Sequence, residues 1–138
     1  MIEEYVSRLT TLMKKKYEKM VEIDTITKDI EQAMKRNDKV STDMFMKMRL
    51  EVMTAVDGID GEIYEILHGG DEKQYHYLRS LINVKTQKQA VDTEFEDEKI
   101  LMLVSLRVRN VLKSIIEKDK VMNKRLLGKE SFYAKNDI

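Results

Sequence analysis

The chain contains no cysteine and no proline, and only five of its 138 residues are glycine. Without cysteine there can be no disulfide framework, no thiol nucleophile and no thiolate-bound metal or cluster. The lack of proline and glycine, together with 36% charged and 42% hydrophobic residues, favours long amphipathic helices. We therefore expect an all-α protein that folds as a single domain over residues 1–138.

Long hydrophobic runs and an excess of charge of one sign are also missing. No stretch approaches the roughly 18 apolar residues that a membrane-spanning helix needs. The first four residues, Met-Ile-Glu-Glu, lack the pattern of a signal peptide. We therefore expect a cytoplasmic protein with no membrane insertion. The 25 basic and 25 acidic side chains balance, which argues against general nucleic-acid binding.

The charges are unevenly distributed along the chain. Residues 41–70 carry two basic and six acidic side chains, whereas residues 104–127 carry seven basic and two acidic ones. Oppositely charged helices attract each other when they lie side by side. We therefore expect these two segments to pack against each other, and we prefer this explanation to a phosphate-binding patch.

A helical hairpin is predicted over residues 1–68. In its first helix, over 2–36, only Lys16 and Thr27 interrupt five heptads of apolar a and d positions. These positions hold Ile2, Val6, Leu9, Met13, Met20, Ile23, Ile30 and Met34. The helix is expected to end at Asn37-Asp38, because asparagine tolerates the left-handed conformation.

The second helix of the hairpin is predicted over residues 42–68, with Ser41 or Thr42 as its N-cap. Gly58 and Gly61 lie inside it, and we interpret them as a weak point or kink in preference to a close helix crossing. Its apolar stripe consists of Phe45, Met48, Val52, Ala55, Val56, Ile59, Ile63, Ile66 and Leu67.

Residues 69–92 are predicted to connect the hairpin to a third long helix. Asp71 is expected to cap a short helix, and the polar stretch 85–89 is expected to be a mobile connection. The alternative is a continuous helix, since nothing in this region breaks one.

The third long helix is predicted over residues 93–127, followed by a flexible tail at 128–138. Thr93 and Glu96 have the spacing of a capping box, and Gly128 is expected to end the helix in the left-handed conformation. Its stripe holds Leu101, Val104, Val108, Val111, Ile115, Met122 and Leu126, and Leu112 and Ile116 widen it. The predicted fold is thus three long antiparallel helices, a hairpin plus a C-terminal helix, with a short connecting helix in a bundle or coiled-coil arrangement.

No motif for catalysis stands out, so we predict that the protein is not an enzyme and needs no cofactor. Glu65 and His68 form one Glu-x-x-His pair, but di-iron bundles use two such pairs, and a metal site is not expected. Met44 and Met46 lie off the buried stripe. Because methionine is flexible and polarizable, they are candidates for a surface that is open to a partner.

Three features together resemble the FlgN-type family of flagellar export chaperones, with the FliT-type chaperones as a related alternative. The first is the break Met34-Lys35-Arg36-Asn37-Asp38 after a heptad helix, and the second is the continuous second helix. The third is the segment 120–127, which ends in Asn123-Lys124-Arg125-Leu126-Leu127 and is followed by Ser131-Phe132. This segment is similar to the Asn-x-x-Leu-Leu close of the family, whose members commonly continue as a helix where this chain has Gly128.

The resemblance implies a cytosolic chaperone that binds the C-terminal amphipathic helices of flagellar hook–filament junction proteins. Such a protein prevents their premature assembly and delivers them to the export apparatus. We expect a client helix to lie in an exposed apolar groove along residues 108–127 and to complete a bundle. The predicted partner-binding residues are Val108, Val111, Ile115, Met122, Leu126 and Leu127 in the groove, Asn123 at its rim, and Phe132 and Tyr133 in the tail.

A structural alternative assigns the same stripes to self-association. In that case the protein is a helical-bundle or coiled-coil protein without a chaperone role, and a second copy of the chain is the partner. For each of the groove residues, burial in the core of the monomer is the competing interpretation.

Overall fold

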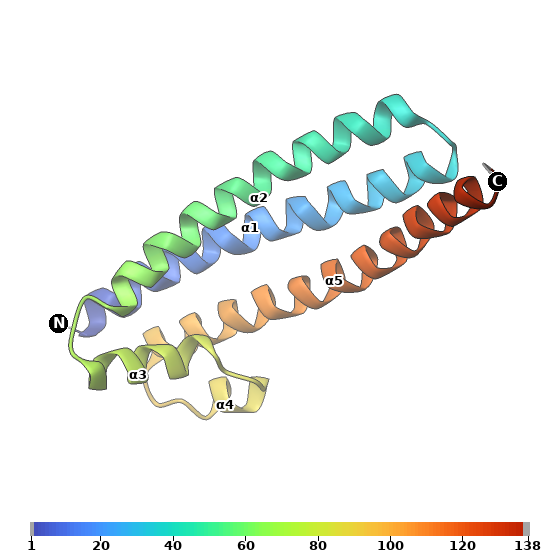
Figure 1. Cartoon of the computed structure of the whole chain (residues 1–138). Helices are drawn as coiled ribbons and strands as arrows, with labels where there is room; N and C mark the ends of the chain where they lie inside the picture. Colours follow the sequence, from blue (N-terminus) through green and yellow to red (C-terminus); the bar gives the residue numbers. More distant parts are fainter. Residues whose placement is uncertain (1, 137–138) are drawn as a thin grey trace.

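The computed structural model describes the backbone of residues 2–136 and the side chains of residues 2–125. The described residues are mostly helical, with short turns between the helices, and contain no strand. Its elements are α1 (Ile2–Lys35), α2 (Lys39–Leu67), α3 (Glu72–Ile82), α4 (Gln87–Val91) and α5 (Glu96–Asn136). The long helices α1, α2 and α5 run in alternating directions along the molecule (Figure 1). The predicted all-α fold of three long helices is therefore confirmed.

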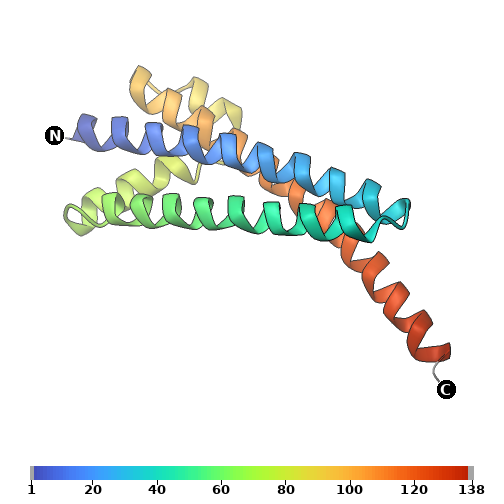
Figure 2. The same cartoon turned by 90° about the horizontal axis from the view of Figure 1, so that it is seen from above.

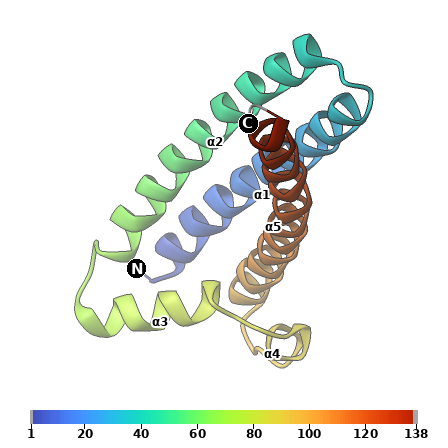
Figure 3. The same cartoon turned by 45° about the vertical axis from the view of Figure 1, so that its right-hand side comes forward.

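Helix α1 is the central element of the molecule. It packs along α2 on one flank and along α5 on the other, whereas α2 and α5 contact each other little. Figure 3 shows the start of α5 on the far side of α1 from α2. The heptad prediction for α1 is confirmed at all a and d positions except Ile2, which is exposed; those buried are Val6, Leu9, Met13, Met20, Ile23, Ile30 and Met34.

The two residues that interrupt the heptads of α1 make polar contacts with α2. The Thr27 side chain is fully buried, where its hydroxyl donates to the Ile23 carbonyl at 2.7 Å and accepts from Arg49 Nε at 3.1 Å. Lys16 Nζ donates to Asp60 Oδ1 at 2.7 Å. Both departures from the apolar pattern therefore lie where α1 meets its neighbour.

The turn between α1 and α2 is built by Asn37 and Asp38. Asn37 has a φ of 55°, which confirms the predicted left-handed conformation. The cap prediction is wrong: Asp38 is the N-cap of α2, and its carboxylate accepts from the backbone N–H of Ser41 at 3.1 Å and from the Ser41 hydroxyl at 2.7 Å. A carboxylate accepts both bonds at once, which a hydroxyl at the same position does less well. These bonds lower the pKa of Asp38 below its ordinary value.

Helix α2 buries fewer side chains than the pattern predicted. Val56, Ile63, Ile66 and Leu67 are buried against α1 and α3, but Met48 and Ala55 are exposed. Their assignment to the buried stripe is wrong, because two helices packed on α1 leave most of the circumference of α2 in solvent. A Cβ atom added at Gly58 or Gly61 would meet no atom within 4 Å, so no helix crosses closely there.

The connector holds two short helices in place of one. Asp71 caps α3 as predicted, accepting from the backbone N–H of Gln74 at 2.8 Å. The prediction of a mobile stretch at 85–89 is wrong, because Thr86 and Gln89 form a capping box that starts α4. Ala90 is then fully buried against the core, which fixes this short helix.

Helix α5 starts later and ends later than predicted. Thr93 is not its cap, because the Thr93 hydroxyl donates to the Gln89 carbonyl at 2.9 Å, and the helix begins at Glu96. The predicted stop at Gly128 is wrong, because the backbone of α5 continues as a helix to Asn136. The flexibility of the tail stays a prediction. A single glycine costs a helix only about 1 kcal/mol, and no proline follows it. Figure 2 shows that α5 crosses the hairpin obliquely and that its last turns project beyond it.

The charge-based packing prediction is also wrong. Among the described side chains, the basic residues of α5 that make ion pairs with the hairpin do so with α1: Lys118 pairs with Asp24, and Arg125 with Glu31 at 3.8 Å. The ion pair between α2 and α5 has the opposite polarity, with the cation on α2 and the anion on α5. Because α1 separates most of α2 from α5, their net charges do not decide the packing.

Candidate functional site

Arg49 of α2 connects all three long helices. Its Nη2 donates to both carboxylate oxygens of Asp119 on α5, at 2.8 and 2.9 Å, while its Nε donates to the hydroxyl of Thr27 on α1. The Arg49 side chain is only 13% exposed and that of Asp119 is 32% exposed. This ion pair joins α2 to α5.

The side chains of α2 one turn before and after Arg49 form two sets. The inner set faces α1, and the outer set faces solvent. Residues three or four positions apart on a helix lie on the same side of it. Phe45 and Val52 flank Arg49 toward α1 and pack in the core. Met46 and Met53 flank it on the other side and are 38% and 40% exposed.

The same division holds around Asp119 on α5. Ile115 and Met122 flank it on the inner side and are buried. On the outer side Ile116 is 45% exposed, and Asn123 is also exposed. Leu112, two turns before Asp119, is 43% exposed. We call the outer surface of Met46, Met53, Leu112, Ile116 and Asn123, which follows the Arg49–Asp119 contact, the seam face.

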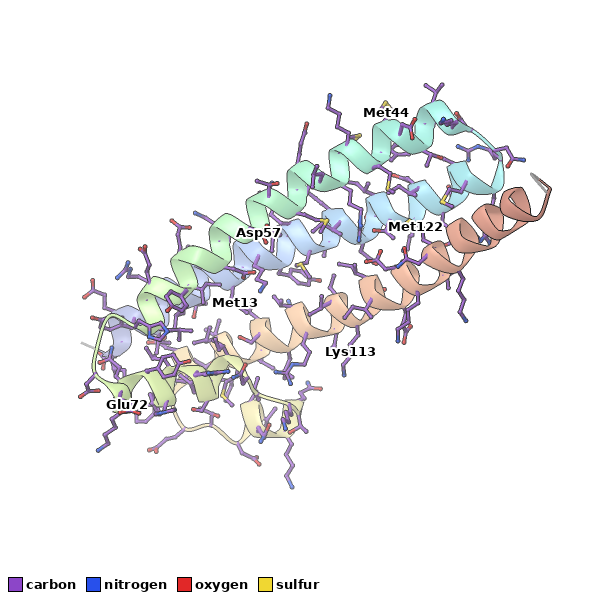
Figure 4. The ribbon with its side chains drawn as sticks, viewed as in Figure 1. Met13, Met44, Asp57, Glu72, Lys113 and Met122 are labelled. Carbon is purple, nitrogen blue, oxygen red and sulfur yellow. The ribbon has the colours of Figure 1, made fainter. Side chains whose placement is uncertain are left out.

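Unpaired charges of opposite sign border the seam face. Lys113 and Lys120 flank Ile116 on α5, and Asp57 follows Met53 by one turn on α2. Figure 4 shows Lys113 pointing away from the hairpin. Within the described residues none of these three side chains has an ion-pair partner. The seam face is therefore an apolar strip with a basic edge on α5 and an acidic residue on α2.

The predicted groove residues fall into three groups. Val108, Ile115 and Met122 are buried between α5 and the hairpin, with exposures of 5%, 5% and 4%. Figure 4 shows Met122 directed from α5 toward the hairpin. Val111 is half-buried beside them. The predicted open groove therefore does not run over these residues, because α1 already covers them.

The remaining predicted residues lie elsewhere. Asn123 is exposed on the seam face, as expected for a rim residue. The side chains of Leu126, Leu127, Phe132 and Tyr133 lie outside the described residues. A partner-binding role for these residues stays a prediction.

Sequence reasoning missed the outer strip of α5, since it assigned Leu112 and Ile116 to a widened buried stripe. Two departures from local composition could have indicated it: Arg49 within an apolar, methionine-rich segment, and Asp119 within a basic one. Of the two methionines proposed to face a partner, Met46 lies on the seam face. Met44 is 52% exposed on another side of α2, where Figure 4 shows it pointing outward.

The aromatic side chains at the corner between α2 and α3 form a stack. The His68 ring lies 4.2 Å from Tyr64 and 4.6 Å from Tyr75, measured between ring centroids. His68 therefore packs between two tyrosines. Across the described residues, no three histidine or acidic side chains come together as a group that could hold a metal ion.

Comparisons of the chain with protein-family models, with curated proteins and with solved structures find no match. None of the described helices combines the length and the apolar character that crossing a membrane requires.

Proposed function

We propose that the protein is a helix-binding export chaperone whose seam face takes the amphipathic C-terminal helix of a client. The resemblance to FlgN-type chaperones supports flagellar hook–filament junction proteins as the clients. Such a chaperone keeps its clients from assembling early and delivers them to the export apparatus in the cytoplasm.

The exposed apolar strip beside the Arg49–Asp119 contact is the observation that supports this proposal. Helices α2 and α5 both pack on α1, which leaves a shallow angle between them. A fourth helix laid in this angle completes a four-helix bundle. Met46 and Met53 suit this role, because methionine adapts its shape to different partners. Apolar anchors of the client at i, i+3, i+4 and i+7 would contact α2 and α5 together.

Charge supports a preferred orientation for the client helix. Lys113 and Lys120 border the strip on α5 and attract acidic side chains, whereas Asp57 borders it on α2 and attracts a basic one. A client helix with acidic residues along one edge is therefore favoured over a helix with basic residues on both edges.

The test uses synthetic peptides that cover the C-terminal helices of flagellar junction proteins. We expect a 1:1 complex by size-exclusion chromatography with light scattering, and saturable binding by calorimetry. Ile116→Asp and Met53→Asp should each weaken binding about tenfold or more, since an apolar anchor is replaced by a charge.

Two variants provide matched controls. Val121 is 44% exposed on another side of α5 from Ile116, and Met48 is 42% exposed on another side of α2 from Met53. Val121→Asp and Met48→Asp should bind as the unmodified chain does. Failure of every junction peptide to form a complex would contradict the chaperone proposal. A concentration-dependent dimer that Ile116→Asp abolishes and Val121→Asp preserves would favour self-association.

A further inference from the structure

A cavity of about 550 Å³ lies at the end of the molecule away from the seam face. It is formed where the start of α1, helix α3 and the start of α5 meet, and Figure 1 shows these three segments together at one end. Ile2, Val6, Tyr77 and Phe95 line it with apolar surface. Its size falls within the range of small-molecule sites, roughly 300–1,000 Å³.

Glu98 is the buried acid of this cavity. It is only 8% exposed, and within the described residues it has neither a hydrogen-bond partner nor an ion-pair partner. Two other acids of the lining do have partners: the Glu96 carboxylate lies 3.7 Å from Lys99 Nζ, and Asp71 caps α3. Burial raises the pKa of Glu98. The largely desolvated position of Glu98 disfavours its charged form, and a cation bound in the cavity would relieve that cost.

A second unused polar group lines the same cavity. Gln74 Nε2 is buried and has no hydrogen-bond partner. The amide lies over Gly70, where an added Cβ would come within 2.6 Å of Gln74 Cδ, so the missing side chain makes room for it. Because this nitrogen is buried over Gly70, which does not line the cavity, the Glu98 carboxylate remains the polar group that the cavity offers to a ligand.

The charges around the cavity favour a positively charged ligand. Besides Glu98, the lining includes the acids Glu3, Asp71, Glu96 and Asp97, against Lys73 as the basic residue among them. Clefts lined by charge of one sign concentrate ligands of the other sign. An anion is therefore disfavoured, and a purely apolar ligand would leave Glu98 unsatisfied.

We propose that this cavity binds an organic cation, a primary ammonium group carried on a short apolar body. The ammonium group donates to the Glu98 carboxylate, and the apolar body contacts Ile2, Val6 and Phe95. The ligand is either a free alkylamine or a lysine side chain of a partner protein, since both present the same chemistry. The site is separate from the seam face and does not depend on the proposed function.

The test is an NMR titration of the full chain with hexylammonium, with 1-hexanol as the uncharged probe of equal length. We expect saturable shifts of the Ile2 and Val6 methyl signals, and hexylammonium binding about tenfold more tightly than hexanol. Equal affinities of the two probes, or no saturable shift at these methyls, would overturn the proposal.

Three variants separate the role of the Glu98 charge from the role of apolar contact with the ligand. Glu98→Gln keeps the shape of the side chain and should abolish the preference for hexylammonium over hexanol. Glu96→Gln is the matched control, which should preserve that preference; an equal loss in both variants would indicate non-specific attraction and contradict the proposal. Phe95→Ala, at a side chain that is 62% exposed, should weaken both probes together without unfolding the chain.

A pair of peptides distinguishes the two sources of the ligand. Acetyl-Leu-Lys-Leu-amide is compared with the same peptide carrying norleucine, which lacks the ammonium group. Tighter binding of the lysine peptide than of hexylammonium, lost in Glu98→Gln, supports a lysine of a partner protein. Binding of hexylammonium alone supports a free amine.

Discussion

Gly58 and Gly61 lie on the solvent side of α2, where a methyl group would meet no atom within 4 Å. Glycine in a helix interior is less favourable than alanine by about 1 kcal/mol, because the unfolded chain loses more freedom. We expect Gly58→Ala and Gly61→Ala each to stabilise the protein by up to about that amount, as measured by urea unfolding. A loss of stability in either variant would mean that these positions serve a close contact after all.

Glu98 gives the folded state a pH dependence that can be measured. Its pKa is raised above the ordinary value of 4.5 by burial, so the folded chain holds this proton more tightly than the unfolded chain. Its contribution to stability is therefore fully present below 4.5 and is lost as the pH rises through the raised value.

Replacement of Glu98 by glutamine should remove this pH dependence. The variant should gain stability relative to the unmodified chain as the pH rises above 4.5, and the gain should level off once the acid is ionised. Urea unfolding across this range measures the difference. Glu96→Gln is the control, at a side chain that is 76% exposed, and should show no such trend. A constant difference at all pH values would contradict the assignment to Glu98.

At the scale of the helices, the Arg49–Asp119 contact is asymmetric. Asp119 is about one-third exposed and can be hydrated when its partner is lost, whereas Arg49 is mostly buried. We expect Asp119→Ala to cost about 1–3 kcal/mol, because it leaves a buried cation with Thr27 as its remaining partner. Arg49→Met keeps the apolar stem and should cost less than about 1 kcal/mol.

A double-mutant cycle tests this asymmetry by urea unfolding. The double variant should be close in stability to Arg49→Met alone, since the aspartate matters only while the arginine is present. Strictly additive losses would show that the contact contributes nothing to holding α2 beside α5.

Local sequence predicted the elements where the apolar pattern was strong, as in α1, and at one of the caps, Asp71. The heptads gave the buried face of α1, and Asp71 gave the start of α3. The start of α5 was misplaced because Thr93 matches a capping box but is held by the Gln89 carbonyl of α4. This local hydrogen bond to the residue four positions earlier competes with the capping role of the Thr93 hydroxyl.

At the scale of the whole molecule, the sequence predicted three long helices but not their arrangement. Net charge favoured contact between α2 and α5, yet both pack on α1, because α1 has the broadest apolar face. Consequently Met48 lies outside the core and Ile116 lies on an open strip. Of the predicted groove residues, Val108, Ile115 and Met122 are therefore covered by α1, whereas Asn123 is exposed on the seam face.

The central place of α1 also has a consequence for synthesis on the ribosome. Once α2 has emerged, the nascent hairpin covers one flank of α1, while the flank that packs against α5 stays exposed. At about 5–20 residues per second, that delay lasts several seconds. During this interval the growing chain exposes apolar side chains that a holdase can bind. The exposure ends when α5 leaves the ribosomal tunnel.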